Sequence, residues 1–307
     1  MDNLCHTLTG AALGEAGLKR RTSYGNAALM IASNLPDIDA VIYLTDSTGF
    51  DFRRGWTHGV LAQAVLPLAL AAALWSIGRA RRRDVRFGWL LALSYVGVAS
   101  HVFLDYLNNY GIRLLAPFDW TWFYGDAVFI VDLFLWTILG AGVWLARRRR
   151  SPAPARGALL FAAAYVAVAL MSTHVARGIV AAAWRDLHGR DPVRVMVGPV
   201  PVTPFTRVVI IDAGETYSVG TFRWGSQSVV FEPMALAKND AAPQVARARE
   251  QSASVREFLV WARFPAWTLV SVPRGTEVTV FDLRFMSRSL NGALFQASTV
   301  VEETAAP

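Results

Sequence analysis

The chain has 307 residues, which is enough for one large domain or two ordinary ones. Its residues are 54% hydrophobic and 17% charged, whereas soluble proteins average about 45–50% apolar and about 25% charged. The net charge of +7 does not indicate nucleic-acid binding, because the sequence lacks a soluble face on which basic and aromatic residues alternate.

Two helices are predicted near the N-terminus, over residues 7–18 and 23–44. The first would reach only about 18 Å and cannot cross a hydrocarbon core of about 30 Å, so we expect it to pack against other helices or to re-enter. The second meets Pro36. Proline disfavours helix in the residues before it, so a break or kink is predicted there.

Four later stretches contain no Asp, Glu, Lys or Arg. Apolar neighbours at 102–104 and 127–131 extend the two shorter ones toward the roughly 20 residues that a span needs. We therefore predict a polytopic transmembrane helix bundle, with four to five spans plus the short N-terminal helix. The charge-free stretches are 59–78, 87–100, 133–146 and 157–173.

The composition changes after Arg185, where a proline-containing linker begins. A helix with one apolar face is predicted over 242–263, among β-rich runs. The predicted fold is thus mainly α, with a membrane-embedded domain over 1–185 and a small extramembrane α+β domain over 186–307. The β-rich runs are 207–212, 216–224, 268–272, 277–285 and 297–302.

His101 and Asp105 are four residues apart on a predicted helix, so both project from one face, one turn apart. Ionisable groups inside a span are costly unless they serve a site. The pair predicts two ligands of one metal ion. A buried structural hydrogen bond is the alternative.

Asp37 and Asp39 flank a single residue, and in an extended or turning segment they would point the same way. Two adjacent carboxylates repel each other unless a cation neutralises them. A divalent metal would do so, and a mixed nitrogen and oxygen shell suits zinc best, with manganese or iron as alternatives. Asp37 is predicted to be catalytic, although it could instead cap the following turn. The predicted ligands are His6, Asp39, His58, His101 and Asp105.

Four charged residues near these ligands complete the predicted site. Arginine beside a metal is the usual partner of a phosphate or carboxylate group, so Arg54 is predicted to hold the substrate and Arg53 to support it. Alternatively, both arginines could simply be exposed to solvent at the membrane interface. Asp126 and Asp132 are each candidates for a ligand, a partner that holds an imidazole, or a general base. Asp132, the deeper, is predicted to be catalytic and Asp126 to support the site.

Three further residues are predicted to lie outside the chemistry. Cys5 is next to His6 but is expected to be a small buried residue. As the single cysteine, it excludes an intramolecular disulfide and a Cys-rich zinc cluster. A structural role is predicted for His174 and solvent exposure for His188.

Basic clusters at 19–21, 79–86 and 147–150 fall between the apolar stretches, and basic loops next to spans indicate the cytoplasmic side. If all three are cytoplasmic, the candidate ligands fall at the outer ends of their helices. We therefore predict a multi-pass membrane protein whose site and C-terminal domain are extracytoplasmic.

Several of these blocks, in this order, resemble the YdjM-type inner-membrane metal-dependent hydrolases, which are described as LexA-regulated in some bacteria. The resemblance covers residues 1 to about 150, and two C-terminal blocks are similar to a β-rich tail that many members carry. It implies a bacterial inner-membrane hydrolase without an established substrate. Cys5 and Gly59 stand where Thr and Ser are common, so no hydroxyl role is expected at either. The blocks are 1–4 with His6, 35–39, 54–58, 100–101 with Asp105, Asp132, 261–265 and 282–284.

The expected reaction is hydrolysis of an ester or phosphoester, in which the metal lowers the pKa of water and Asp37 or Asp132 handles the proton. A site at the lipid–water boundary favours an amphiphilic or lipid substrate from the bilayer. A metal transporter or sensor is one alternative, but it would need polar residues through the bundle. The other alternative is a metal-stapled scaffold, meaning a structural protein in which the metal only holds the helices together. Such a metal would have no open coordination position.

Overall fold

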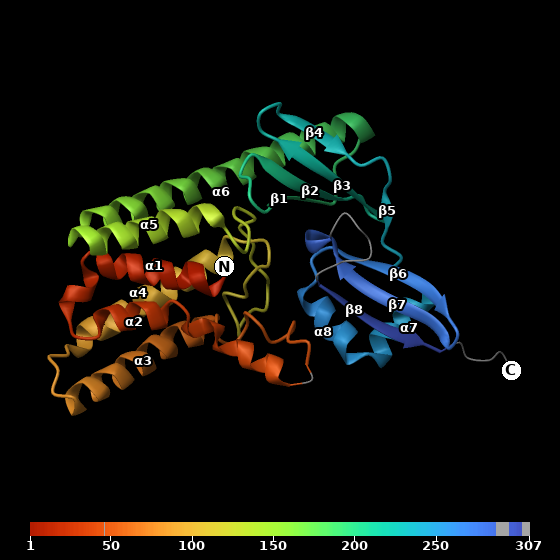
Figure 1. Ribbon diagram of the computed structural model, residues 1–307. Helices are drawn as coiled ribbons and strands as arrows, with labels where there is room; N and C mark the ends of the chain where they lie inside the picture. The colour runs from red at the N-terminus through yellow and green to blue at the C-terminus, as the bar shows by residue number, and fades with distance from the viewer. Residues whose placement is uncertain (46, 287–294, 303–307) are drawn as a thin grey trace. The chain divides into compact units, whose positions relative to one another are not determined.

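The computed structural model describes residues 1–45, 47–286 and 295–302 (Figure 1). The chain folds into two compact units. The first, here the helical unit, contains Met1–Ala40, Arg53–His174 and Pro199–Pro204. The second, here the β unit, contains Val41–Phe52, Val175–Gly198 and Phe205–Pro307.

The helical unit is built from long helices that lie side by side (Figure 1). Helix α1 contacts α2 and α5, and α4 contacts α2 and α3. The predicted break at Pro36 is confirmed, since α2 and the 3₁₀ helix η2 meet at an angle of 49°. The elements are α1 (Asn3–Glu15), η1 (Leu18–Arg21), α2 (Gly25–Ala32), η2 (Leu35–Leu44), α3 (Val60–Ala80), α4 (Phe87–Tyr106), α5 (Leu133–Arg149) and α6 (Ala153–His188).

Among the described residues, three helices are long and apolar enough to cross a membrane, namely α3, α4 and α6. The bent pair of α2 and η2 would make a fourth if it is one span. The predicted count of four to five is therefore not confirmed. Residues 127–131 do not extend α5, because the Asp132 side chain accepts a hydrogen bond from Leu135 N and caps the helix there. The resulting 17-residue helix is about 25 Å long.

Two glycines let α2 approach its neighbours closely. A Cβ at Gly97 of α4 would lie 2.5 Å from the Ala32 Cβ, and a Cβ at Gly10 of α1 would lie 2.8 Å from the Leu29 carbonyl oxygen. Helix α2 is thus held tightly between α1 and α4. This packing sets where the η2 segment that follows α2 begins.

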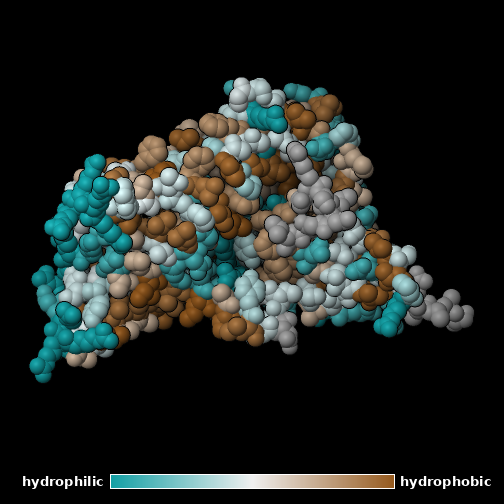
Figure 2. All heavy atoms as spheres, viewed as in Figure 1, coloured by the Kyte–Doolittle hydropathy of each residue, from teal (hydrophilic) through white to brown (hydrophobic). Residues whose placement is uncertain are grey.

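Figure 2 shows hydrophobic side chains along the helices and hydrophilic ones where the α3–α4 and α5–α6 connections lie. The basic clusters at 79–86 and 147–150 fall in these connections. The N-terminus of α1 lies at the opposite end of the helices (Figure 1). The helical unit therefore has a basic end and, at the other end, the start of α1.

The described residues of the β unit form two sheets. In the larger one the order is β1-β2-β3-β4, with β5 also paired to β3; the smaller one is β6-β7-β8, an antiparallel meander. The elements are β1 (Arg194–Pro199), β2 (Thr206–Asp212), β3 (Thr216–Arg223), β4 (Ser228–Phe231), β5 (Leu236–Ala237), α7 (Pro243–Gln251), α8 (Ala253–Trp261), β6 (Pro265–Val272), β7 (Gly275–Asp282), η3 (Leu283–Phe285) and β8 (Gln296–Val301).

The five predicted β-rich runs correspond to β2, β3, β6, β7 and β8. The predicted helix over 242–263 is two helices, because the Ser252 side chain accepts from Val255 N and starts a new one. Strands β1, β4 and β5 were not predicted.

The division between units falls inside α6, between residues 174 and 175, rather than at the predicted 185/186 boundary. Val180 and Trp184 of α6 belong to the core that contains Val209, Ile211 and Phe222 of the larger sheet. The composition change marks where the apolar sequence stops. Helix α6, however, already packs against the larger sheet from Ala176 onward, before the composition changes.

Candidate metal centre

Four side chains from three segments form one ligand cluster: Asp37 of η2, His58 of the turn before α3, and His101 and Asp105 of α4. Each offers one ligand atom, and these atoms all lie within 4.8 Å of one another. The two histidines and Asp105 are fully buried, and Asp37 is 8% exposed. Four groups of this kind are costly to bury together unless a cation joins them.

Three of the ligand atoms converge on one point. The Nε2 atoms of His58 and His101 are 3.1 Å apart, and the Asp105 Oδ2 atom lies 3.3 Å and 3.4 Å from them. This carboxylate oxygen is buried and has no hydrogen-bond partner among the described residues. Two imidazole nitrogens and a carboxylate oxygen are a donor set that suits zinc or another divalent transition metal. The residues present fit a metal ion.

The far side of each imidazole is held by an oxygen atom. His101 Nδ1 donates to the Ser33 carbonyl oxygen, 2.8 Å away, since a carbonyl only accepts. His58 Nδ1 lies 2.9 Å from Thr57 Oγ1 and 3.5 Å from Asp39 Oδ2. A proton on Nδ1 leaves the Nε2 lone pair for a metal, which is how ligating histidines are oriented in metalloproteins.

The structure gives Asp37 and Asp39 different surroundings. Asp37 Oδ1 lies 3.9 Å from His58 Nε2, on the side of the cluster, whereas Asp39 lies behind His58 and accepts from Arg54 N and Thr57 Oγ1. The segment is 3₁₀ helix rather than extended, so two residues that flank one position point in different directions. Asp37 therefore belongs to the group of four, whereas Asp39, a predicted ligand, lies outside it.

Arg54 faces the protein interior and is 4% exposed. Its NH2 group lies 3.0 Å from Asp105 Oδ1, and its NH1 group donates to Asn108 Oδ1 and the Gly111 carbonyl oxygen. The guanidinium also lies over the Tyr110 ring, 4.5 Å from its centre. These contacts hold Asp105 in place and leave Arg54 turned away from solvent.

Arg53 joins the two η2 carboxylates. Its NH2 group lies 3.2 Å from Asp37 Oδ1 and its NH1 group lies 3.1 Å from Asp39 Oδ1. The Arg53 side chain is 15% exposed, against 5% for Arg54. Of the two arginines, Arg53 is thus the more accessible.

His6 of α1 forms the wall behind His101. The two rings are stacked with centroids 3.9 Å apart, and His6 Nε2 lies 3.3 Å from Asp105 Oδ1. Both ring nitrogens of His6 are buried, and the described part of the chain offers neither a hydrogen-bond partner. Burial lowers the pKa of His6 to about 3 and also lowers the pKa of His58. Both imidazoles are therefore neutral, the form that binds metals.

Asp132 and Asp126 lie outside the ligand cluster. Both oxygens of the Asp132 carboxylate are engaged, one by Leu135 N and the other by the Tyr165 hydroxyl, which donates over 2.8 Å. Asp126 is buried, and its carbonyl oxygen accepts from Thr173 Oγ1. The structure does not bring either side chain into the group of four.

The residues predicted to be outside the chemistry also lie outside the cluster. Cys5 is a buried free thiol, and burial raises its pKa to about 12. His174 and His188 are exposed. Gly59 has a steric reason to lack a side chain, because a Cβ there would lie 2.2 Å from the Ala116 carbonyl oxygen.

Sequence reasoning missed the residues that orient the ligands. Thr57 could have been found, since its hydroxyl is next to His58 in the chain. Ser33 contributes only a carbonyl oxygen, and Asn108 and Tyr110 act through Arg54, so no residue pattern marks their roles.

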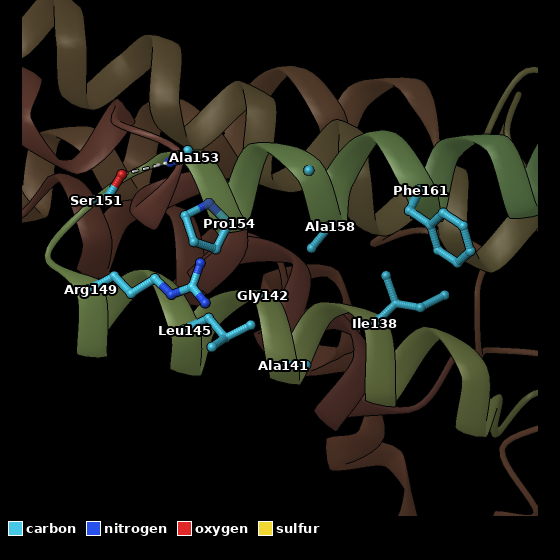
Figure 3. Close-up of a pocket in the computed structure, with 11 residues that line it drawn as sticks. Ile138, Ala141, Gly142, Leu145, Arg149, Ser151, Ala153, Pro154, Ala158 and Phe161 are labelled. Carbon is cyan, nitrogen blue, oxygen red and sulfur yellow. Dashed lines mark hydrogen bonds between the residues drawn. The ribbon is translucent and has the colours of Figure 1, made fainter.

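A cavity of about 500 Å³ reaches the cluster at Asp37. A second cavity, of about 600 Å³, is lined by residues of α5 and α6. Figure 3 shows its small and apolar side chains facing each other beside Arg149. Of these two cavities, the first is the one that touches a candidate ligand. It is lined by Asn3, Thr7, Met30, Ile31, Asn34, Leu35, Asp37 and Ile38.

Comparison with known proteins gives two matches. The family model of the YdjM inner membrane protein matches residues 1–176, which include the whole cluster. The chain is also similar to the uncharacterized protein YfhP of Bacillus subtilis (strain 168), with 23% identity over 301 residues, covering 94% of this chain and 88% of the relative. No solved structure matches.

Proposed function

We propose a metal-dependent hydrolase function for this chain, which belongs to the YdjM inner membrane protein family. One observation carries the proposal: the Nε2 atoms of His58 and His101 converge with a buried Asp105 oxygen to which no described residue donates a hydrogen bond. Asp37 lies beside them and lines a cavity. A metal ion held by these residues would lie next to this cavity, and catalytic metal sites keep one coordination position open.

His58, His101 and Asp105 are the proposed ligands, with zinc as the first candidate and manganese or iron as alternatives. When bound by these residues, a divalent metal would supply water of lowered pKa and polarise the bond to be cleaved. His6 remains a candidate for a further ligand, because both its ring nitrogens are buried without a hydrogen-bond partner in the described ranges.

Asp37 is the proposed general base. It is the least buried of the four clustered residues, and its Oδ1 atom faces His58 Nε2. Arg53, 3.2 Å from the same oxygen, keeps Asp37 ionised and ready to accept a proton. Asp132 is a weaker candidate, since hydrogen bonds engage both its oxygens.

The other charged residues position the ligands. Arg54 fixes Asp105, and Asp39 fixes the ring of His58. For the anionic group of a substrate, Arg53 is a better partner than Arg54, because Arg54 is turned into the protein. Phosphate and carboxylate esters are both compatible with this arrangement.

An ester of an amphiphilic lipid is the proposed substrate class. The cavity at Asp37 is lined by four apolar side chains, Met30, Ile31, Leu35 and Ile38, which come from the bent pair α2–η2. The apolar part of a lipid would lie along this wall, with its ester directed to Asp37. If the basic connections are cytoplasmic, the site faces the extracytoplasmic side.

The deep burial of three ligands favours a second candidate function, a metal-stapled scaffold without turnover. One experiment separates the two. The full chain is purified in detergent, its bound metal is measured, and phosphoester and acyl-ester lipids are offered to the parent and to His101→Ala and Asp37→Asn variants. Hydrolase function predicts turnover by the parent only.

His174→Ala is the control for this experiment, since His174 is exposed and outside the cluster, and it should keep both metal and activity. Metal in the parent without turnover of any lipid would favour the scaffold. Full metal content in His101→Ala would show that the metal is not bound at the proposed site.

A further inference from the structure

Residues 41–52 connect the two halves of the metal site along the chain. Asp37 and Asp39 precede this segment, and Arg53, Arg54 and His58 follow it. The segment itself packs as part of the β unit. The β unit thus contains the connection between the site's carboxylates and its arginines.

A single carboxylate of α8 holds the polar end of the segment. Glu257 Oε2 accepts from Ser47 Oγ at 3.1 Å, from Thr48 N at 2.9 Å and from Thr48 Oγ1 at 2.5 Å. Three hydrogen bonds to one charged oxygen are a strong and directional contact, because hydrogen bonds to ionised acceptors are about twice as strong as neutral ones.

An aromatic cluster holds the other end. The Phe50 ring is stacked on Trp261, 5.1 Å between centroids, and meets Phe258 edge-on at 5.1 Å. Phe258 and Trp261 are fully buried. Trp261 is itself fixed by Arg284, whose guanidinium lies 4.3 Å from the ring centre. Phe50 is thus anchored on the part of the β unit that contains the 261–265 and 282–284 blocks.

The anchored segment ends where the site begins. Arg53 reaches back to both Asp37 and Asp39, and Arg54 N donates to Asp39 Oδ2 over 2.8 Å. The two ends of the 41–52 segment therefore meet at the site. Fixing its middle reduces the conformational freedom that must be lost when its ends come together.

We propose that Phe50 and Glu257 are positioning residues for the metal site, and that the β unit sets metal affinity by anchoring residues 41–52. This inference rests on the proposed metal site but not on hydrolysis. It assigns the C-terminal part of the chain a role in the chemistry of the helical unit, carried by chain continuity through Arg53 and Arg54.

The test is the Zn²⁺ affinity of the full chain in detergent, measured by competition with a chromogenic chelator. Phe50→Ala and Glu257→Gln should each weaken Zn²⁺ binding by about tenfold or more, the range found when groups that orient ligands are removed. Phe50→Tyr keeps the ring and should restore affinity. Thr48→Val removes one hydroxyl donor without changing shape and should weaken binding less than Glu257→Gln.

Phe222→Ala is the control, because Phe222 is fully buried in a core of the β unit that contains none of residues 41–52. It should destabilise the β unit without changing Zn²⁺ affinity. Unchanged affinity in both Phe50→Ala and Glu257→Gln overturns the proposal, as does an equal loss in Phe222→Ala.

The Thr48→Val and Glu257→Gln changes should not be additive, since they remove one shared contact. This pair keeps the test valid if Phe50→Ala does not fold. If the parent binds no Zn²⁺, the proposed metal site itself is wrong. If the parent binds Zn²⁺ but hydrolyses no substrate, only the hydrolase proposal fails and this inference stands.

Discussion

His58 and His101 point their Nε2 atoms at each other across 3.1 Å, although one precedes α3 and the other lies in α4. His101 donates its Nδ1 proton to the Ser33 carbonyl oxygen, so its Nε2 atom carries a lone pair when the ring is neutral. Asp39 fixes the same tautomer in His58 through Thr57, whose hydroxyl donates to Asp39 Oδ2 and therefore accepts from His58 Nδ1. Two nitrogen lone pairs and a carboxylate oxygen at such short distances repel one another, and a cation between them would remove this repulsion.

Asp39→Asn should weaken metal binding by about 10–100-fold, because Asp39 holds the His58 ring from behind. Asp37→Asn should instead abolish turnover even at saturating metal, since Asp37 is the proposed base. Equilibrium dialysis with Zn²⁺ measures the first effect, and lipid-ester turnover at saturating Zn²⁺ measures the second. Parent-like affinity in Asp39→Asn would show that this carboxylate does not orient the ligand.

The spacing of His101 and Asp105 could be translated directly into geometry, because residues four apart on a helix share a face and α4 is regular there. The spacing of Asp37 and Asp39 could not be translated into geometry in the same way. Its orientation depends on whether the segment after Pro36 is extended or 3₁₀ helix, and a proline signals only that the preceding helix ends. Asp37, predicted to be catalytic, therefore lies on the side of the cluster, whereas Asp39, predicted to be a ligand, lies behind His58.

The arginines illustrate a second limit. Their closeness to His58 was predictable from the chain, but the direction of each guanidinium depends on partners that lie far away in sequence. Arg54 turns inward because Asp105, Asn108 and the Gly111 carbonyl oxygen lie there. The docking of residues 41–52 on α8 depends likewise on contacts of long sequence separation.

Arg54→Met should lower the free energy of unfolding of the metal-free protein by about 1–3 kcal/mol, because it removes one of two described cationic partners of the buried Asp105 carboxylate and leaves only the Met1 ammonium group. Arg53→Met should cost less, since the Arg53 side chain is 15% exposed. Unfolding with denaturant in mixed micelles gives both values. Equal losses in the two variants would contradict the structural role of Arg54.

Gly97→Ala should destabilise the helical unit by about 1–3 kcal/mol, the usual cost of overpacking, because the new Cβ would lie 2.5 Å from the Ala32 Cβ. Since α2 must then move, the Asp37 turn moves with it and Zn²⁺ affinity should fall. Gly88→Ala is the control on the same helix: no described residue lies within 4 Å of its Cβ, so both quantities should stay the same or improve slightly. Thermal unfolding and Zn²⁺ titration check both variants.

The Asp282–Arg284 pair should make the β unit sensitive to acid. Burial alone would raise the pKa of Asp282, but the Arg284 guanidinium and hydrogen bonds from Arg284 and from Phe264 N outweigh it and lower that pKa. A lowered pKa in the folded state means that the pair stabilises the fold fully above the ordinary aspartate value of about 3.9. This stabilisation is lost as the pH falls through the folded-state pKa.

Asp282→Asn should therefore destabilise the β unit at neutral pH by about 3–5 kcal/mol, because Arg284 is left buried with its charge uncompensated. It should also remove most of the loss of stability between neutral pH and acid. Hydrogen exchange of the β6 and β7 amides, followed by mass spectrometry at several pH values, reports on this unit alone. Asp191→Asn, which breaks the exposed pair with Arg185, should change protection by no more than about 1 kcal/mol. Equal effects of the two substitutions would mean that the buried pair does not stabilise the fold.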